Sequence, residues 1–182
     1  MRAKTAMRAG ALGERAGSPP DATTTAAIER ALEPLLARAT RVASYVPFGT
    51  EPGLTPRPGW LLPVLLPDRD LDWAAYDGRL SGGPVQEPVG RRLGREALGG
   101  CDLVLVPALR VDRAGHRLGR GGGSYDRALP RARGLVVALL LDGELVDSVP
   151  WAAHDVPVQA VVTPTAGLVR IPSPTPLPRT AG

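Results

Sequence analysis

Short runs of hydrophobic residues, bounded by glycine, proline or charged side chains, recur along the chain. Runs of this length without helical spacing are typical of strands that are buried on both faces of a sheet. They predict strands at 41–47, 60–66, 103–106, 135–141 and 160–163. The segments that join them leave room for helices or long crossovers, so the pattern predicts an α/β fold with a largely parallel sheet.

Helical periodicity is clearest in the N-terminal third of the chain. Ile28 and Leu32 lie on one face of a predicted helix that follows Asp21 or Thr25, either of which can cap it, and that runs to about residue 38. Pro34 falls inside this span, so we expect a kink or a later start.

The pattern is weaker in the remaining segments. A short helix is predicted at 125–132, directly after a glycine-rich turn, whereas residues 1–20 show only weak helical character. The prolines of 48–59 predict a loop, and 68–98 is predicted to be irregular with several turns.

Length and composition favour a single domain. A chain of 182 residues can bury a substantial core, which we place at 1–169, and the Pro-, Ser- and Thr-rich tail at 170–182 is predicted to be disordered. The single cysteine, Cys101, excludes an internal disulfide and fits a reducing cytoplasm. No apolar run is long enough to cross a bilayer, and no apolar segment follows the basic N-terminus, so we expect a cytoplasmic protein without a membrane span.

The charge balance invites a nucleic-acid interpretation, which the distribution of residues disfavours. The formal net charge is +4, and the arginines are scattered rather than gathered into a stripe. Aromatic residues make up only 4% of the chain, which is too few for a base-stacking platform. A local positive field for a small anionic ligand is the simpler expectation.

The most informative motif is a glycine-rich turn. Residues 118–126 read Leu-Gly-Arg-Gly-Gly-Gly-Ser-Tyr-Asp and follow the hydrophobic run at 102–107. Glycine permits positive φ angles and lets backbone N–H groups approach a phosphate closely. The turn carries three arginines and one carboxylate that could bind magnesium, namely Arg117, Arg120, Arg127 and Asp126. A flexible surface turn is the alternative, but the combination predicts nucleotide chemistry.

The same segment closely resembles the signature of the 5-formyltetrahydrofolate cyclo-ligase family, also called methenyltetrahydrofolate synthetases. Four other segments agree with the family in the same order: Lys4-Thr-Ala-Met-Arg8, Tyr45-Val-Pro47 with Glu51, Gln86-Glu-Pro88, and Val149-Pro150 with His154-Asp155-Val156-Pro157 and Val161-Val-Thr163. The resemblance covers about residues 4–165. It implies a Rossmann-like α/β sandwich, a monomer, and the ATP- and Mg²⁺-dependent conversion of 5-formyltetrahydrofolate to 5,10-methenyltetrahydrofolate.

The resemblance also implies roles for individual residues. It implies ATP contacts for Lys4, Arg8, Arg117, Leu118, Gly119, Arg120, Gly121, Gly122, Gly123, Ser124 and Tyr125. It implies contacts to the reduced folate for Tyr45, Val46, Glu51, Arg120, Gly121, Gly122, Gly123 and Ser124. Asp126 and Asp155 are the implied magnesium ligands, and Arg120 and Tyr125 the implied catalytic residues.

Aromatic and histidine residues outside these motifs have plainer interpretations. Trp60 and Trp151 are interpreted as core residues, whereas Trp73 and Tyr76 either line the folate pocket or pack elsewhere. His154 is interpreted as a structural neighbour of Asp155 rather than as a base.

Three positions depart from the family pattern. Ser124 stands where the family usually has the first of two tyrosines, 52–59 leaves little room for a family helix, and Gln159 stands where an acidic residue is common. Two functions therefore stay open: the ATP-dependent enzyme, and a non-catalytic folate- or nucleotide-binding module on the same fold. The implied metal and triphosphate contacts favour the enzyme, because a plain folate binder has no use for them.

Overall fold

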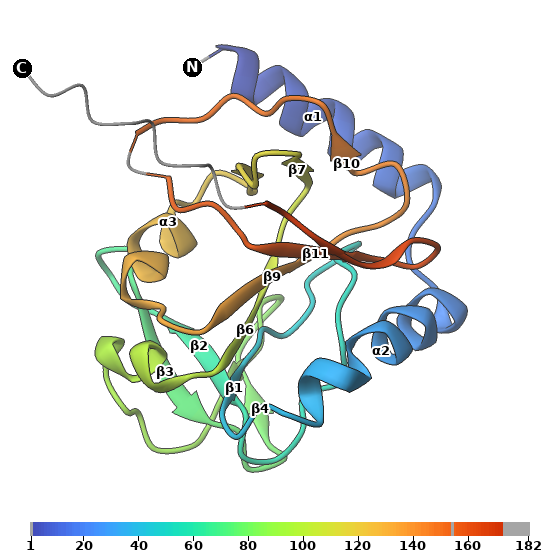
Figure 1. Ribbon diagram of the computed structural model, residues 1–182. Coiled ribbons are helices and arrows are strands. Elements are labelled where there is room, and N and C mark those ends of the chain that lie inside the picture. Colours follow the sequence, from blue (N-terminus) through green and yellow to red (C-terminus); the bar gives the residue numbers. More distant parts are fainter. Residues whose placement is uncertain (1, 154, 173–182) are drawn as a thin grey trace, which may run out of the picture.

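The computed structural model describes residues 2–153 and 155–172, and a sheet runs through the centre of the molecule (Figure 1). The helices of these residues are α1 (Arg2–Gly17), α2 (Ala22–Leu36) and α3 (Ser124–Ala128), with the 3-10 helices η1 (Arg95–Gly100) and η2 (Leu129–Arg131). The strands are β1 (Val42–Ala43), β2 (Leu61–Leu65), β3 (Leu71–Ala75), β4 (Leu80–Ser81), β5 (Glu87–Pro88), β6 (Leu103–Pro107), β7 (Arg110–Asp112), β8 (Arg117–Leu118), β9 (Leu135–Leu139), β10 (Leu145–Val146), β11 (Ala160–Thr163) and β12 (Gly167–Arg170).

Within the described residues, seven strands form the main sheet in the order β12-β11-β9-β6-β1-β2-β3. The strands from β11 to β2 run parallel, while β12 and β3 pair antiparallel at the two edges. The predicted largely parallel sheet is therefore confirmed. The predicted strands fall on β1, β2, β6, β9 and β11, although β1 is shorter than expected.

The strand order reverses between β1 and β6. The chain passes from β1 to β2 and β3 on one side, then returns to place β6, β9 and β11 on the other. The segments that leave β1 and β6 therefore diverge at the carboxyl ends of two neighbouring parallel strands. A crevice forms at such a point, and in open α/β sheets it is where ligands bind.

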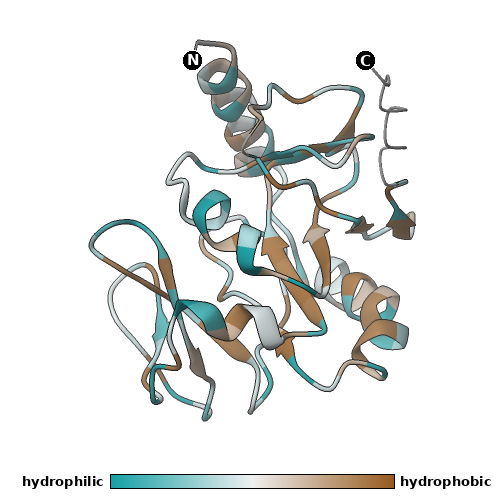
Figure 2. Cartoon of the chain, turned by 60° about the vertical axis from the view of Figure 1, so that its left-hand side comes forward, coloured by the Kyte–Doolittle hydropathy of each residue, from teal (hydrophilic) through white to brown (hydrophobic). Residues whose placement is uncertain are grey.

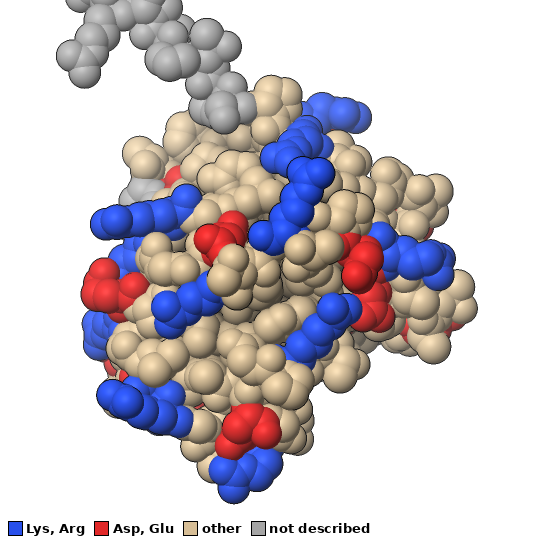
Figure 3. All heavy atoms as spheres, turned by 60° about the horizontal axis from the view of Figure 1, so that its bottom comes forward, with Lys and Arg blue, Asp and Glu red and all other residues tan. Residues whose placement is uncertain are grey.

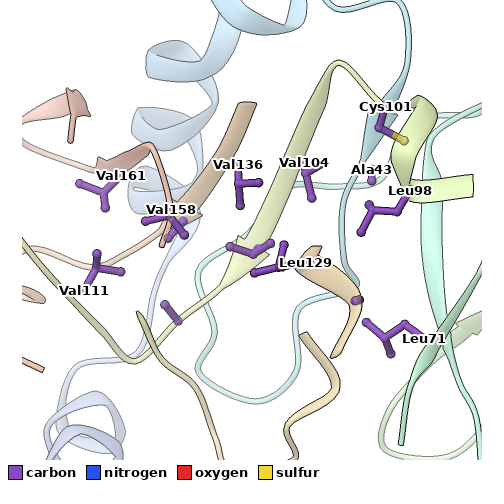
Figure 4. Close-up of a cluster of buried hydrophobic side chains, with 14 of the residues drawn as sticks. Ala43, Leu71, Leu98, Cys101, Val104, Val111, Leu129, Val136, Val158 and Val161 are labelled. Atoms are coloured by element: carbon purple, nitrogen blue, oxygen red, sulfur yellow. The ribbon is translucent and has the colours of Figure 1, made fainter. Parts of the chain in front are cut away.

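Side chains of the central strands alternate between two buried faces. On β6, Leu103 and Leu105 pack in the cluster that contains Ile28 and Leu32 of α2. Val104 points to the opposite face, where it joins residues from β9, η2 and β11 (Figure 4). Hydrophobic residues concentrate accordingly in the central strands and along α2 (Figure 2). Because both faces of the sheet are covered, the central strands appear in the sequence as continuous runs of apolar residues.

Helix α2 matches its prediction closely. Asp21 caps it by accepting a hydrogen bond from the Thr24 backbone N–H at 2.8 Å. Pro34 lies near the end of the helix, which begins at Ala22 and ends at Leu36, so the later start expected from this proline is not observed.

Helix α1 was underestimated by the sequence pattern. Where only weak helical character was expected, the structure has a helix of 16 residues. The reason is its composition: the helix is rich in alanine and glycine, and its buried apolar contacts come from Ala11 with partly buried Met7 and Leu12. These residues leave a faint hydrophobic stripe, and the helix is held partly by ion pairs that periodicity does not reveal.

The prediction of irregular chain at 68–98 was wrong in part. Strand β3 pairs with β2 along its whole length after a turn in which Arg69 has a φ of 66°. The strand is short and flanked by charged residues, so its alternation is difficult to detect. Trp73 on β3 is a core residue, 1% exposed.

The first residues of the tail predicted to be disordered, 170–182, are part of the fold. Arg170 ends β12 and Ile171 is buried. Positions 173–182 lie outside the described residues.

The packing of α2 against the sheet leads to a stability prediction. Leu32 is fully buried, so Leu32→Ala is expected to lower the free energy of unfolding by about 2–5 kcal/mol through lost burial and a residual cavity. The same truncation at Leu93, which is 39% exposed, is expected to cost about 1 kcal/mol or less. Urea denaturation of both variants makes the comparison, and equal losses would contradict the described packing of α2.

Candidate functional site

A cavity of about 390 Å³ opens at the crevice between β1 and β6. Tyr45 and Val46 enter it from the segment after β1, and Pro107 and Ala108 from the end of β6. All residues that the sequence assigned to ATP, folate or metal line this one cavity, although they come from α1, the β1 loop, the glycine-rich turn and the segment before β11. Their individual roles stay predictions.

The glycine-rich turn runs from β8 to α3 along one wall of the cavity. Gly121 and Gly123 have φ angles of 103° and 75°, in the region that favours glycine. A Cβ atom on Gly121 would lie 3.4 Å from the Arg8 guanidinium carbon, and one on Gly123 would lie 2.7 Å from Nη1 of Arg127. The turn therefore needs glycine for its backbone angles.

Arg117 lies at the base of the turn and is almost completely buried. Its Nη2 donates to Oδ1 of Asp126 at 2.6 Å, its Nη1 donates to the Pro107 carbonyl at 3.3 Å, and its guanidinium stacks 5.5 Å from the Tyr125 ring centre. Burial lowers the pKa of Arg117, while the Asp126 and Asp155 carboxylates oppose that shift. Asp126 is held in place by this arginine, with 40% of its side chain exposed.

The second candidate metal ligand is joined to α1. Oδ2 of Asp155 lies 3.1 Å from Nζ of Lys4 and accepts a hydrogen bond from the Ala152 backbone at 2.9 Å. Four residues further along α1, Arg8 donates from Nε to the Gly119 carbonyl at 2.9 Å. Lys4 and Arg8 thus contact two different segments that line the cavity.

An ion pair connects the glycine-rich turn to the loop after β1. Nε of Arg120 lies 2.8 Å from Oε1 of Glu51, and Nη2 donates to the Phe48 carbonyl at 3.2 Å. Oε2 of Glu51 accepts from the Phe48 backbone N–H at 3.0 Å. The sequence assigned Arg120 to both ATP and the folate and Glu51 to the folate, and the structure places the two side chains in direct contact.

Two tyrosines that line the cavity have buried, neutral hydroxyl groups. Burial raises the pKa of Tyr125, and the Glu51 carboxylate adds to that rise. The pKa of Tyr45 is raised for the same two reasons, and its hydroxyl donates to the Pro52 carbonyl. The Tyr125 hydroxyl has no hydrogen-bond partner within the described part of the chain. Because its pKa is raised, the Tyr125 hydroxyl is protonated at neutral pH and can donate a hydrogen bond.

Sequence reasoning missed an apolar wall of the cavity. Its apolar residues come from β2, β3 and the segment before β5, with two polar residues beside them: Pro63, Leu65, Leu71 and Val85, next to Gln86 and Glu87. Alternation along the predicted strand at 60–66 places Pro63 and Leu65 on one face, which is the signal that could have found part of it. Leu65 and Val85 are each 55% exposed, so this wall offers apolar surface to a ligand.

The tryptophans and histidines have different surroundings. Trp60 is a core residue, as predicted, at 8% exposure. The prediction that Trp151 is a core residue was wrong: it is 57% exposed and stacks on His116 at a ring-centre distance of 4.4 Å, because its segment runs over the surface beside β8. His154 lies outside the described residues.

Two further features concern nucleic-acid binding and membrane insertion, namely the distribution of surface charge and the length and hydropathy of the helices. On the face shown in Figure 3, basic and acidic side chains are interspersed rather than separated into fields of one sign. No helix in the described ranges is both long and apolar enough to span a bilayer.

Comparisons with known proteins agree on one family. The model of the 5-formyltetrahydrofolate cyclo-ligase family matches residues 2–164. A 5-formyltetrahydrofolate cyclo-ligase of Mycolicibacterium smegmatis is 40% identical over 148 residues, which cover 71% of this chain and 76% of that protein. The solved structure of Aquifex aeolicus 5,10-methenyltetrahydrofolate synthetase superimposes with a TM-score of 0.75 at 26% identity, covering 96% of this chain and 95% of the other. A synthetase from Mycoplasma pneumoniae, 17% identical, shares the fold with a TM-score of 0.69 over 87% of this chain and 96% of its own.

The geometry of the turn leads to a prediction about ligand binding. Gly121→Ala is expected to weaken ATP binding about tenfold, because a side chain strains the backbone at this positive φ angle and shifts the N–H groups of the turn. Gly78 is a matched control, since its φ is 95° but a Cβ there meets no atom within 4 Å. Isothermal titration calorimetry with ATP measures both variants, and equal affinities would contradict the assigned role of the turn.

Proposed function

Since the chain belongs to the 5-formyltetrahydrofolate cyclo-ligase family, we propose that its cavity carries out the family reaction with the residues described above. ATP and 5-formyltetrahydrofolate are converted to 5,10-methenyltetrahydrofolate, ADP and phosphate. The observation that supports this most is the convergence of the phosphate-binding and folate-binding candidates on one cavity.

The chemistry explains why both substrates must share one cavity. The oxygen of a formamide is a poor leaving group, so the γ-phosphoryl group of ATP is first transferred to it. The resulting carbon is electrophilic, N10 of the folate attacks it, and the C–O bond breaks to release phosphate while N10 loses its proton. Such a transfer depends on positioning and charge neutralisation rather than on a protein nucleophile.

The triphosphate end of the cavity is assigned to α1 and the glycine-rich turn. Lys4 and Arg8 supply cations from one helix, and the N–H groups of 119–123 supply neutral donors from the turn that Arg8 contacts. Arg117 is already partnered by Asp126, so its contribution is to hold that carboxylate and the turn in place.

Arg120 lies at the boundary between the two substrates. It is on the glycine-rich turn and contacts Glu51, the residue assigned to the polar edge of the pterin. From this position its guanidinium can neutralise the charge that develops on the transferring phosphoryl group. Tyr125, a neutral phenol with a free hydrogen, is assigned as a donor to the same oxygens.

The folate end is assigned to the segment after β1 and to the apolar wall. The Glu51 carboxylate can accept two N–H donors from a pterin ring. Pro63, Leu65 and Val85 offer the apolar surface on which flat rings pack.

Magnesium is assigned to Asp126 and Asp155. Among the described residues no cluster of three or more His, Cys, Asp or Glu is arranged to hold a metal ion by itself. Two carboxylates beside a triphosphate site nevertheless fit Mg²⁺, which commonly takes one or two protein carboxylates and completes its shell with phosphate oxygens and water. When bound, the ion neutralises phosphate charge.

The absorbance band of methenyltetrahydrofolate tests the proposed function. Purified protein with Mg²⁺ and 5-formyltetrahydrofolate is expected to produce the band only when ATP is added, and a chelator is expected to stop it. A flat trace from protein that still binds both ligands would contradict the proposal and indicate a non-catalytic binder.

Asp126→Asn tests the metal assignment. The amide oxygen can still accept from Arg117, so the fold is expected to persist, while loss of the charge is expected to lower kcat at least about 100-fold. Asp147→Asn is the control, because that side chain is 97% exposed. A wild-type rate for Asp126→Asn would remove this residue from the metal site.

Lys4→Ala tests the triphosphate assignment. Loss of a charge-assisted contact is expected to raise KM for ATP about 10- to 100-fold and to change KM for the folate by less than about twofold. Arg113→Ala, at a side chain 74% exposed, serves as control. An unchanged ATP dependence would place Lys4 outside the phosphate site.

A further inference from the structure

One face of α1 carries a regular series of residues that point toward the body of the protein. Lys4, Arg8, Ala11 and Arg15 are spaced by four, three and four positions, which places them on one side of a helix. Lys4 and Arg8 line the cavity, whereas Ala11 and Arg15 are each 2% exposed. The helix therefore faces the ligand site at one end and is buried at the other.

Apolar packing along this face is limited. The buried cluster beneath the helix has Ala11 as its fully buried contribution from α1, with Met7 and Leu12 only partly buried, against Leu109 and Leu118. Small and partly exposed side chains of this kind give weak directional control over the rotation and axial position of a helix.

Arg15 supplies directional contacts at the buried end. Its Nε and Nη2 donate to the two carboxylate oxygens of Glu144 at 2.7 and 2.6 Å, an arrangement in which both groups are fixed in one plane. Nη2 also donates to the Ala108 carbonyl at 2.5 Å. The Arg15 and Glu144 side chains are 1% and 5% exposed, so water does not weaken the pair.

The partners of Arg15 are themselves part of the cavity frame. Ala108 follows β6 directly and lines the cavity. Glu144 accepts a further hydrogen bond from the Leu141 backbone at 2.8 Å and lies 3.2 Å from Arg110, whose backbone belongs to β7. The Arg15–Glu144 pair thus links α1 to the cavity wall and to the turn after β9.

We propose that Arg15 and Glu144 are positioning residues that hold α1 in the register required for Lys4 and Arg8 to reach the triphosphate. This inference rests on the proposed function of the cavity. Lys4 lies eleven residues from Arg15, about 16 Å along the helix axis. A helix transmits a shift at one end to the other, and a misplacement of about 1 Å near reacting groups can cost about 100-fold in rate.

The chemistry of the pair supports positioning over simple stabilisation. Burying two charges costs desolvation free energy that their attraction offsets only when the geometry is good, and apolar residues often stabilise equally well. Here one guanidinium nitrogen, Nη1 of Arg15, is buried without a partner among the described residues. The fixed geometry that the Arg15–Glu144 pair imposes on α1 accounts for this desolvation cost better than a gain in stability does.

The test compares ATP and folate parameters in Arg15→Met and Glu144→Gln. Both are expected to weaken ATP binding about tenfold or more in calorimetry, while KM for the folate changes by less than about twofold. Arg57→Met is the matched control, because it removes an exposed ion pair between the loop before β2 and Glu29 of α2 and should leave both parameters unchanged. If Arg15→Met does not fold, Arg15→Lys, which keeps the charge but loses the bidentate contact, replaces it.

A double-mutant cycle with Lys4→Ala separates positioning from stability. If Arg15 acts through the α1 cations, the combined loss of ATP affinity in Arg15→Met with Lys4→Ala is expected to be smaller than the product of the single losses. Multiplicative losses, or a lower melting temperature with unchanged ATP affinity, would overturn the proposal. Because calorimetry does not require turnover, failure of the proposed reaction would be recognised separately by the absence of product from the wild-type protein.

Discussion

Charge pairing in the cavity is the constraint on which the site depends. Three cations assigned to phosphate or to its surroundings are each bonded to a carboxylate with an assigned role of its own: Lys4 to Asp155, Arg117 to Asp126, and Arg120 to Glu51. Buried or half-buried charges are stable only when partnered. Two of these pairs, Lys4–Asp155 and Arg120–Glu51, also join segments that are distant in sequence, so the same contacts that satisfy the charges assemble the cavity.

The sheet topology makes this pairing possible. The reversal of strand order between β1 and β6 lets the loop after β1 and the chain after β6 diverge around a common space. Helix α1 then closes that space from outside the main sheet, with its position set by the buried Arg15–Glu144 pair in our proposal. A triphosphate and a divalent cation carry charges complementary to the arginines and carboxylates that meet there.

Sequence patterns revealed the central strands because burial on both faces produces uninterrupted apolar runs, as in β6 and β9. The glycine-rich turn could also be predicted from the sequence, since the positive φ angles at Gly121 and Gly123 favour glycine over other residues. Helix α1 could not be predicted with the same clarity, because an alanine-rich helix held partly by ion pairs lacks a clear hydrophobic period. The contact between Arg120 and Glu51 joins residues far apart in the chain, and no local pattern encodes it. No local pattern encodes the place of Val85 in the apolar wall of the cavity either.

Isotope transfer from the formyl group measures the central claim most directly, namely that ATP and the folate meet in one cavity and that the phosphoryl group passes to the formyl oxygen. The experiment uses 5-formyltetrahydrofolate labelled with ¹⁸O in its formyl group, together with ATP, Mg²⁺ and the wild-type protein. Our account predicts one ¹⁸O atom in each released phosphate, as the C–O bond breaks on ring closure. Unlabelled phosphate accompanying the methenyl product would contradict it.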